Sequence, residues 1–214
     1  MPNFTLAEGL YVMPSPAGAY YAVSRPEHEP ARRLIINLLQ HRKSPRLSIR
    51  GLQDWAAAKD EQRAAELLHR MQVLGWIQGL KTEQQAPDGT LEDLLPKLLR
   101  PLSADGKVLL ADQQGFYVSS LGYPHETAEE LSALSADLAS LHDRHHGLLE
   151  NNMGLGTSAW AIVDAAGNSQ VGFWPLYIGD QRFVLVVGGL PQLNRQALTD
   201  LIWALCIRYA KASW

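Results

Sequence analysis

Residues 126–149 have the sequence ETAEELSALSADLASLHDRHHGLL, and its period is typical of one long amphipathic helix. One stripe recurs at alternating steps of three and four residues and consists of Leu131, Leu134, Leu138, Leu141, His145 and Leu148. A second stripe beside it holds the small side chains of Ala128, Ser132, Ser135 and Ala139. Small side chains let a neighbouring backbone approach closely, so this helix is suited to two neighbours, such as its own sheet and a second helix. The same pattern also fits an ordinary core helix buried on two sides.

The length and composition are those of an ordinary globular protein. The 214 residues suffice for one large domain or two small ones, and 46% are hydrophobic and 19% charged. No window approaches 18 consecutive apolar residues, so we expect no membrane span. The N-terminus lacks a basic segment followed by an apolar one, so we expect no secretion signal and a cytoplasmic location. The single Cys206 lies in an apolar run and is expected to be a small core residue.

The net charge of −3 conceals an uneven distribution. Residues 1–82 hold 11 Lys and Arg against 7 Asp and Glu, whereas the remainder holds 8 against 15. This division suggests two modules with different partners. The excess of four positive charges in the first part does not by itself establish nucleic-acid binding.

The elements around the long helix predict one sheet. A leucine-rich helix is expected at 91–102, followed by a hairpin with strands at 107–112 and 116–120. After the long helix come three expected strands, at 158–164, 170–178 and 182–188, and a last helix at 194–211. The predicted fold class is therefore α+β, with a five-stranded antiparallel sheet between helices.

Residues 91–212 resemble the roadblock family of dynein-light-chain type, which is related to longin and profilin-like folds. The resemblance is carried by the strand that ends at Asp112 before Gly115, by the Glu-rich start and Ala/Ser/Leu body of the long helix, and by the hairpin at 170–188. It implies pairing of two copies through the long helix and the strand at 158–164. Its interface candidates are Leu131, Ser135, Leu138, His142, Trp160 and Ile162. The resemblance also implies a small Ras-like GTPase as partner. From the residues themselves we expect no cofactor.

Residues 28–81 show a helix, a short helix, a longer helix and a strand, an order that resembles the winged helix-turn-helix superfamily. A β-hairpin is expected before them, with strands at 10–13 and 20–23. Residues 82–90 are polar and broken by Pro87 and Gly89, so no strand returns to complete a wing. We therefore expect the strand at 76–80 to pair with the N-terminal hairpin. The predicted domains are 1–82 and 91–214, joined by a linker at 83–90.

Basic residues of the first module are candidates for nucleic-acid contact. Arg63 and Arg70 lie seven positions apart on one side of the expected recognition helix. The whole set comprises Arg46, Arg50, Gln62, Arg63 and Arg70. Glu61 and Glu66 share the same helix and oppose this interpretation.

The sequence gives only weak indications of a metal site or a catalytic site. His142 and His146 lie four positions apart, as paired histidine ligands do, and Glu150 or Asp143 would have to supply a third ligand. The same histidines also suit the C-terminus of a helix, where its dipole favours cations. Gly-x-Ser-x-Gly is absent, and the paired carboxylates all fall in expected first helical turns. We therefore expect neither an enzyme nor a bound metal.

These observations lead to a first hypothesis, a non-enzymatic regulatory or scaffolding protein that homodimerises through its second module. The alternative is a transcriptional regulator, in which the winged helix contacts DNA and the second module dimerises or senses a ligand. A small-ligand sensor is a third interpretation, because related folds can hold pockets.

Overall fold

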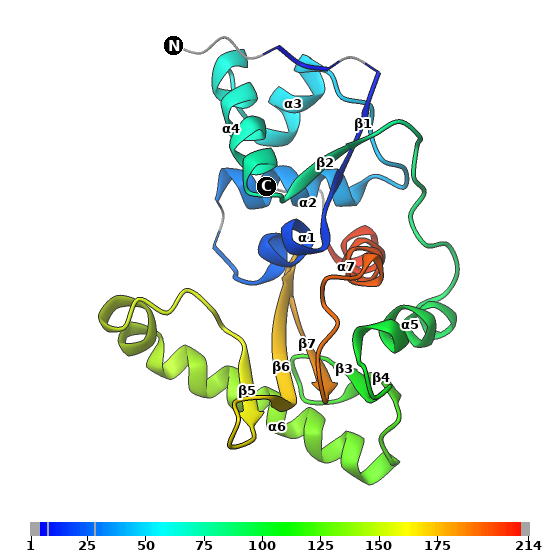
Figure 1. Ribbon diagram of the computed structural model, residues 1–214, viewed down its shortest axis with the longest axis vertical. Helices are drawn as coiled ribbons and strands as arrows, with labels where there is room; N and C mark the ends of the chain where they lie inside the picture. The colour runs from blue at the N-terminus through cyan, green and yellow to red at the C-terminus, as the bar shows by residue number, and fades with distance from the viewer. Residues whose placement is uncertain (1–4, 8, 28, 211–214) are drawn as a thin grey trace.

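The computed structural model describes residues 5–7, 9–27 and 29–210. Figure 1 shows a helical region at one end of the molecule, a β-sheet in its lower half, and the long helix α6 across the opposite end. Helix α7 lies between these regions, beside α1.

The sheet has five strands in the order β4-β3-β7-β6-β5, and every neighbouring pair is antiparallel. Its strands are β3 (Val108–Ala111), β4 (Tyr117–Leu121), β5 (Trp160–Val163), β6 (Ser169–Ile178) and β7 (Gln181–Gly188). All four residues of β3 are buried, as expected for a central strand covered on both faces. The five-stranded antiparallel sheet predicted from the sequence is confirmed.

The two faces of the sheet carry different helices. Helices α1 (Pro16–Val23), α5 (Leu91–Leu99) and α7 (Gln196–Tyr209) cover one face, and α6 (His125–His146) covers the other. Successive residues of a strand point to opposite faces. Accordingly, Val108 and Leu110 belong to the larger apolar cluster under α5 and α7, whereas Leu109 belongs to the smaller one under α6.

Helix α6 packs on the sheet through its small side chains. Its buried residues are Ala128, Ser132, Ser135 and Ala139, the four members of the small-residue stripe. The leucine stripe lies at the margin of this contact, and Leu134 is 38% exposed. After His146 the chain continues through a π-helical turn, Gly147–Asn152, before it returns to β5.

The helical region contains α2 (Pro30–Gln40), α3 (Ile49–Ala56) and α4 (Glu61–Val73). Ser48 and Asp60 accept hydrogen bonds from the first backbone amides of α3 and α4, as N-cap side chains do. Strand β2 (Ile77–Leu80) follows α4 and pairs antiparallel with β1 (Tyr11–Pro14). The predicted pairing of this strand with residues 10–13 is thus confirmed.

The predicted second strand of the N-terminal hairpin, at 20–23, is wrong because these residues belong to α1. The Ser15 hydroxyl accepts a hydrogen bond from the Gly18 amide at 3.1 Å, and Pro16 occupies the first helical turn. Both features are signals for the start of a helix. Gly18 also lets α1 approach the backbone at Trp76, because a Cβ at position 18 would lie 2.0 Å from the Trp76 carbonyl oxygen.

The helical region and the sheet share buried apolar contacts. Helices α1 and α2 pack against α7, and one continuous apolar cluster extends from β1 to α7. The Trp203 indole donates a hydrogen bond to the His41 carbonyl oxygen at 2.8 Å across this contact. Residues 83–90 form no helix or strand of their own, but the Ala86 amide donates to the Arg42 carbonyl. The division at 83–90 into two modules stays a prediction.

Candidate protein-interaction site

Strand β5 lies at an edge of the sheet and pairs with β6 alone among the strands described. Trp160 lies opposite Phe173 and Ile162 opposite Val171, with an irregular register between Ile162 and Val163. Ile162 is 56% exposed and Val163 55%. An edge strand with exposed apolar side chains can pair with another chain, because its outer N–H and C=O groups lack a strand partner.

Trp160 and His142 connect this edge to α6. Phe173, which lies opposite Trp160, belongs to the cluster under α6, so Trp160 points to the same face of the sheet as α6. The rings of His142 and Trp160 meet edge to face, with their centroids 6.4 Å apart. Burial lowers the pKa of His142, and the carboxylate of Asp143 opposes this effect. The structure therefore brings together two of the predicted interface residues.

The predicted interface residues on α6 lie at different depths. Leu131 and Leu138 are partly buried at the edge of the α6 cluster. Ser135 is only 1% exposed, and its hydroxyl donates to the Ser132 carbonyl at 2.7 Å. Ser135 thus faces the sheet of its own chain, whereas Leu131, Leu138 and His142 keep part of their surface accessible.

The connection between α6 and β5 exposes apolar side chains, of which the sequence analysis singled out only Leu148. Leu148, Met153 and Leu155 are 50%, 59% and 43% exposed. Met153 and Leu155 are isolated apolar residues among glycine and asparagine, a weak signal that could have marked them. In Figure 1 this segment projects beside the sheet on the same side as β5. Together with Ile162 and Val163 these residues extend the apolar surface beyond the sheet edge.

Acidic side chains near the paired histidines are already engaged. Glu150 forms an ion pair with Arg25 at 2.6 Å, and its other carboxylate oxygen lies 3.1 Å from Nε2 of His146. Asp143 pairs with Arg182 at 3.2 Å. Among the described residues, no group of three metal-capable side chains is gathered around a common point.

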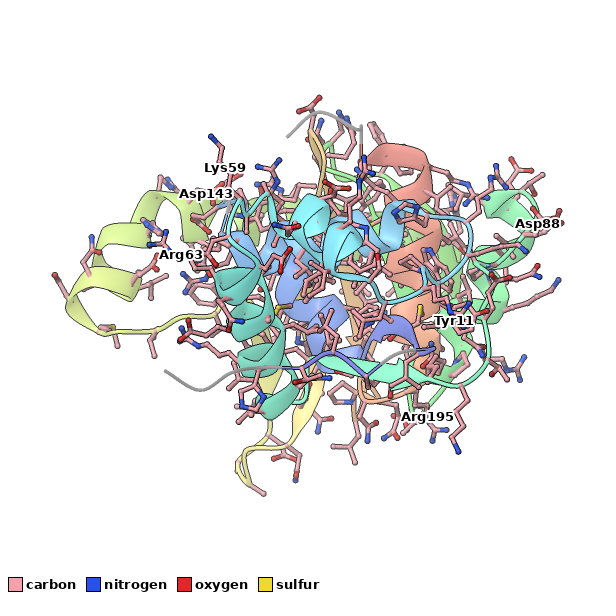
Figure 2. All side chains as sticks on the ribbon, turned by 90° about the horizontal axis from the view of Figure 1, so that it is seen from above. Tyr11, Lys59, Arg63, Asp88, Asp143 and Arg195 are labelled. Atoms are coloured by element: carbon pink, nitrogen blue, oxygen red, sulfur yellow. The ribbon has the colours of Figure 1, made fainter. Side chains whose placement is uncertain are left out.

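The five nucleic-acid candidates are all exposed in the helical region. Arg50 lies on α3, and Gln62, Arg63 and Arg70 lie on α4. Arg46 precedes α3 and faces Tyr11 in an isolated β-bridge. Figure 2, seen from the helical end, shows Arg63 at the start of α4. The exposed Glu61 and Glu66 on the same helix reduce its net positive charge.

Cys206 is fully buried in α7, and burial raises the pKa of its thiol to about 12. The predicted core position of this residue is confirmed, and a thiol of this kind is unsuited to nucleophilic chemistry. No helix in the described part of the chain has the length and apolar character needed to cross a membrane.

Comparison with known proteins gives a fold likeness only. No protein-family model matches the chain, and no curated protein matches its sequence. Among solved structures, the chain is similar to the crystal structure of a Roadblock/LC7 domain from Streptomyces avermitilis. The two are 15% identical, the match covers 56% of this chain and 93% of that one, and the TM-score is 0.35. A likeness at this level carries no argument about function, so the roadblock resemblance rests on the order of helices and strands.

Proposed function

We propose that this protein is a non-enzymatic regulatory or scaffolding protein that homodimerises through β5 and α6. The observation that carries the proposal is that two features lie side by side. One is the edge strand β5, and the other is helix α6, whose leucine side chains stay partly exposed. Ile162 and Val163 expose more than half of their surface on that edge, and Leu134 and Leu148 are exposed on the helix and just beyond it. Two copies related by a twofold axis would each cover the other's edge with the same patch.

The opposite sheet edge is less suited to pairing. Strand β4 contacts both α5 and α6, whereas the principal contacts of β5 are with its neighbour β6. Helices on both sides of a strand hinder the approach of another chain. We therefore assign the dimer contact to β5, and the sheet would continue from one subunit into the next.

A matched pair of variants tests this assignment. Ile162→Glu places a charge in the proposed interface and is expected to raise the dimer dissociation constant at least tenfold, about 1.4 kcal/mol or more. Val118→Glu makes a similar change on β4, where Val118 is 42% exposed, and should leave dimerisation unchanged. Sedimentation velocity over a dilution series gives both constants. Equal effects of the two variants, or no effect of Ile162→Glu, would reject the β5 interface.

The proposed partner of the dimer is a small Ras-like GTPase, on the strength of the roadblock resemblance. Purified GTPases loaded with GDP or a GTP analogue can be titrated against the dimer and against Ile162→Glu. The proposal expects saturable binding that depends on the bound nucleotide. Equal, salt-sensitive retention of every loaded form would argue against a GTPase partner.

DNA binding by a winged-helix module at residues 1–82 is the second candidate function. The observation in its favour is that Arg50 on α3 and Arg63 and Arg70 on α4 are exposed. Figure 1 shows these two helices at the end of the molecule away from α6. A dimer formed through α6 and β5 would leave them accessible.

Titration of a labelled pool of DNA duplexes separates the two functions. Binding that falls steeply with salt, and falls further in Arg63→Ala and Arg70→Ala, supports a regulator of transcription. Arg195→Ala, on the exposed turn before α7, is the control. No binding at low salt, or equal loss in the control, would dismiss the DNA function.

A further inference from the structure

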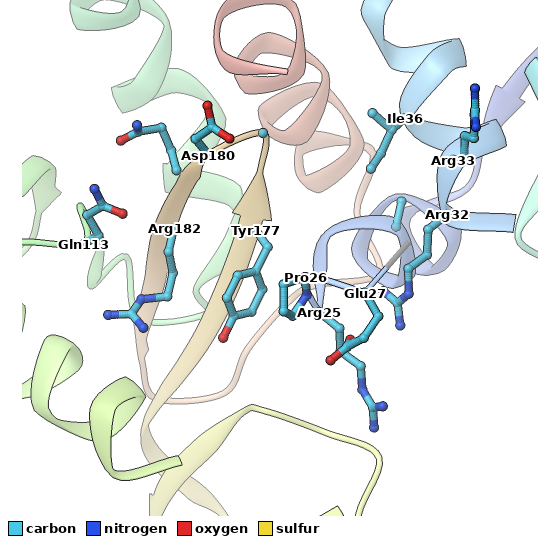
Figure 3. A pocket seen from close by; sticks show the side chains of 13 residues that line it. Arg25, Pro26, Glu27, Arg32, Arg33, Ile36, Gln113, Tyr177, Asp180 and Arg182 are labelled. Atoms are coloured by element: carbon cyan, nitrogen blue, oxygen red, sulfur yellow. The ribbon is translucent and has the colours of Figure 1, made fainter. Parts of the chain in front are cut away.

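A cavity of about 410 Å³ lies between the α1–α2 region and the hairpin of β6 and β7. Figure 3 shows Tyr177, Asp180 and Arg182 on the hairpin side, and Arg32, Arg33 and Ile36 across from them on α2. Pro26 and Glu27, from the turn between α1 and α2, lie between the two walls. The cavity is therefore built from both the helical region and the sheet.

The lining of this cavity is positively charged. Four arginines line it, Arg25, Arg32, Arg33 and Arg182, against the two carboxylates of Glu27 and Asp180. Arg25 and Arg182 also pair with Glu150 and Asp143, which lie outside this lining. Because these two pairs offset the charge of Arg25 and Arg182, the case for an anionic occupant rests on Arg32.

Arg32 is the most informative of the four. It is only 5% exposed, and its guanidinium lies over the Tyr21 ring at 4.3 Å. One terminal nitrogen donates to the Tyr21 carbonyl and to the Ser24 hydroxyl. Among the described residues, its Nε–H has no hydrogen-bond partner and no carboxylate forms an ion pair with it. Burying a guanidinium without a counter-ion is costly, so a site that holds one is prepared for an anion from outside.

We propose that this cavity binds a small phosphate-bearing molecule whose phosphate is held by Arg32. Guanidinium groups match phosphate oxygens in geometry and charge, and the buried, unpaired Nε–H of Arg32 is the donor that a bound phosphate would satisfy. Tyr177, Pro26 and Ile36 give the cavity an apolar wall for the body of the ligand. The volume lies within the range of small-molecule sites.

The ligand would join two parts of the chain. Arg32 and Pro26 come from the helical region, and Tyr177 comes from β6. A molecule that contacts both stabilises their packing, because a ligand that binds only the folded state adds to its stability. This inference is independent of the dimer contact, since β5 does not line the cavity.

The test is a ¹H–¹⁵N NMR titration of the arginine Nε–Hε groups in the full chain. Inorganic phosphate, AMP and adenosine are added separately, each to about 10 mM, ten times a weak dissociation constant of about 1 mM. We expect the Arg32 signal to shift with phosphate and with AMP, and not with adenosine. Tighter binding of AMP supports an organic phosphate, and equal binding supports free phosphate. An unchanged Arg32 signal with both phosphates would overturn the proposal.

Variants link binding to the side chains. Arg32→Lys keeps the charge but lacks the Nε–H, and should weaken phosphate and AMP binding at least tenfold by calorimetry. Tyr177→Leu leaves Arg32 in place and should weaken AMP while leaving phosphate unchanged. Arg195→Gln, at an arginine that does not line the cavity, should bind as the parent chain does. If Arg32→Lys fails to fold, the NMR shift in the parent chain decides; a folded Arg32→Lys with full affinity overturns the proposal.

Discussion

The two faces of the sheet are covered very differently. Helices α1, α5 and α7 lie over one face, where Leu99, Leu185 and Ile202 are completely buried in the larger apolar cluster. In the part of the chain that the structure describes, α6 is the one helix over the other face, and the apolar cluster there has six buried members, two of them alanines. The first face forms a fully buried core. The second face leaves leucines of α6 partly exposed at its margin, next to the exposed apolar side chains of strand β5.

This difference shows how one sheet can contribute both to the stability of the folded chain and to association with a second molecule. The cluster on the α7 side, which continues into the helical region, holds most of the buried apolar residues described. The α6 face is held by close backbone approach through small side chains, which leaves the larger side chains of α6 at the surface. Burying such side chains against a second molecule adds the contacts that the chain itself does not provide.

The largest contrast between the faces is expected in thiol reactivity. Cys206 on α7 is fully buried and its thiol pKa is raised to about 12 by burial, so it reacts only when the protein opens. A cysteine in place of the exposed Leu134 on α6 should react at least about 10³ times faster at pH 8, given a typical unfolding free energy. Labelling with a thiol reagent, followed by mass spectrometry, measures both rates. Similar rates at the two positions would contradict the contrast.

The next largest effect is the loss of a core side chain under α7. Trp203 is 1% exposed, and its indole donates to the His41 carbonyl. Trp203→Ala should lower the free energy of unfolding by about 4 kcal/mol, because it leaves a cavity and an unpaired carbonyl. Denaturant titration followed by circular dichroism gives this value. A loss below about 1 kcal/mol would show that the α7 face is not the main core.

On the α6 face, enlargement of a small side chain is expected to be harmful. Ala139 is 3% exposed and lies against the sheet. Ala139→Leu should therefore cost about 2 kcal/mol of unfolding free energy through overpacking. Ser140→Leu, at the exposed neighbouring position, is the control and should change stability by about 0.5 kcal/mol or less. Equal costs at 139 and 140 would place the sheet contact of α6 elsewhere.

The smallest effect concerns a carboxyl on α7. Burial raises the pKa of Asp200, and a hydrogen bond from Gln196 opposes the rise. Because the folded pKa lies above the unfolded one, the charged form of Asp200 costs stability at neutral pH. Asp200→Asn should raise the unfolding free energy at pH 7 by about 0.5 kcal/mol or less, since the group is partly solvated.

This gain should vanish as the pH falls below the ordinary aspartate pKa, where both folded and unfolded chains carry the protonated carboxyl. Melting temperatures of the two chains between acid and neutral pH provide the measurement. A gain that persists unchanged in acid would mean that the charge of Asp200 is not its cause.

Most of the sheet could be predicted from the sequence because its signals are local. Alternating and continuous apolar runs marked all five strands. The two stripes of α6 were also visible, but the sequence did not decide which of them packs on the sheet. The start of α1 was missed because Pro14, Ser15 and Pro16 suit a turn as well as a helix N-terminus. The choice between a turn and a helix start at this point depends on the pairing of β1 with β2, which is not local in the sequence.

The candidate sites were predictable only in part. The resemblance named His142 and Trp160 as interface candidates but did not predict that their rings meet. The burial of Ser135 depends on the rotation of α6 about its axis, which a period cannot fix. The cavity around Arg32 was not predicted at all. Its walls come from α2 and from β6, which are more than 100 residues apart in the chain, so no local pattern reveals it.

The mass of the protein in dilute solution tests the central claim most directly. Light scattering coupled to size exclusion, over a range of low micromolar concentrations, measures it without any substitution. A dimer through β5 and α6 predicts a particle of twice the 23.7 kDa chain mass, which shifts toward a single chain in Ile162→Glu. A particle of single-chain mass at every concentration would contradict the account.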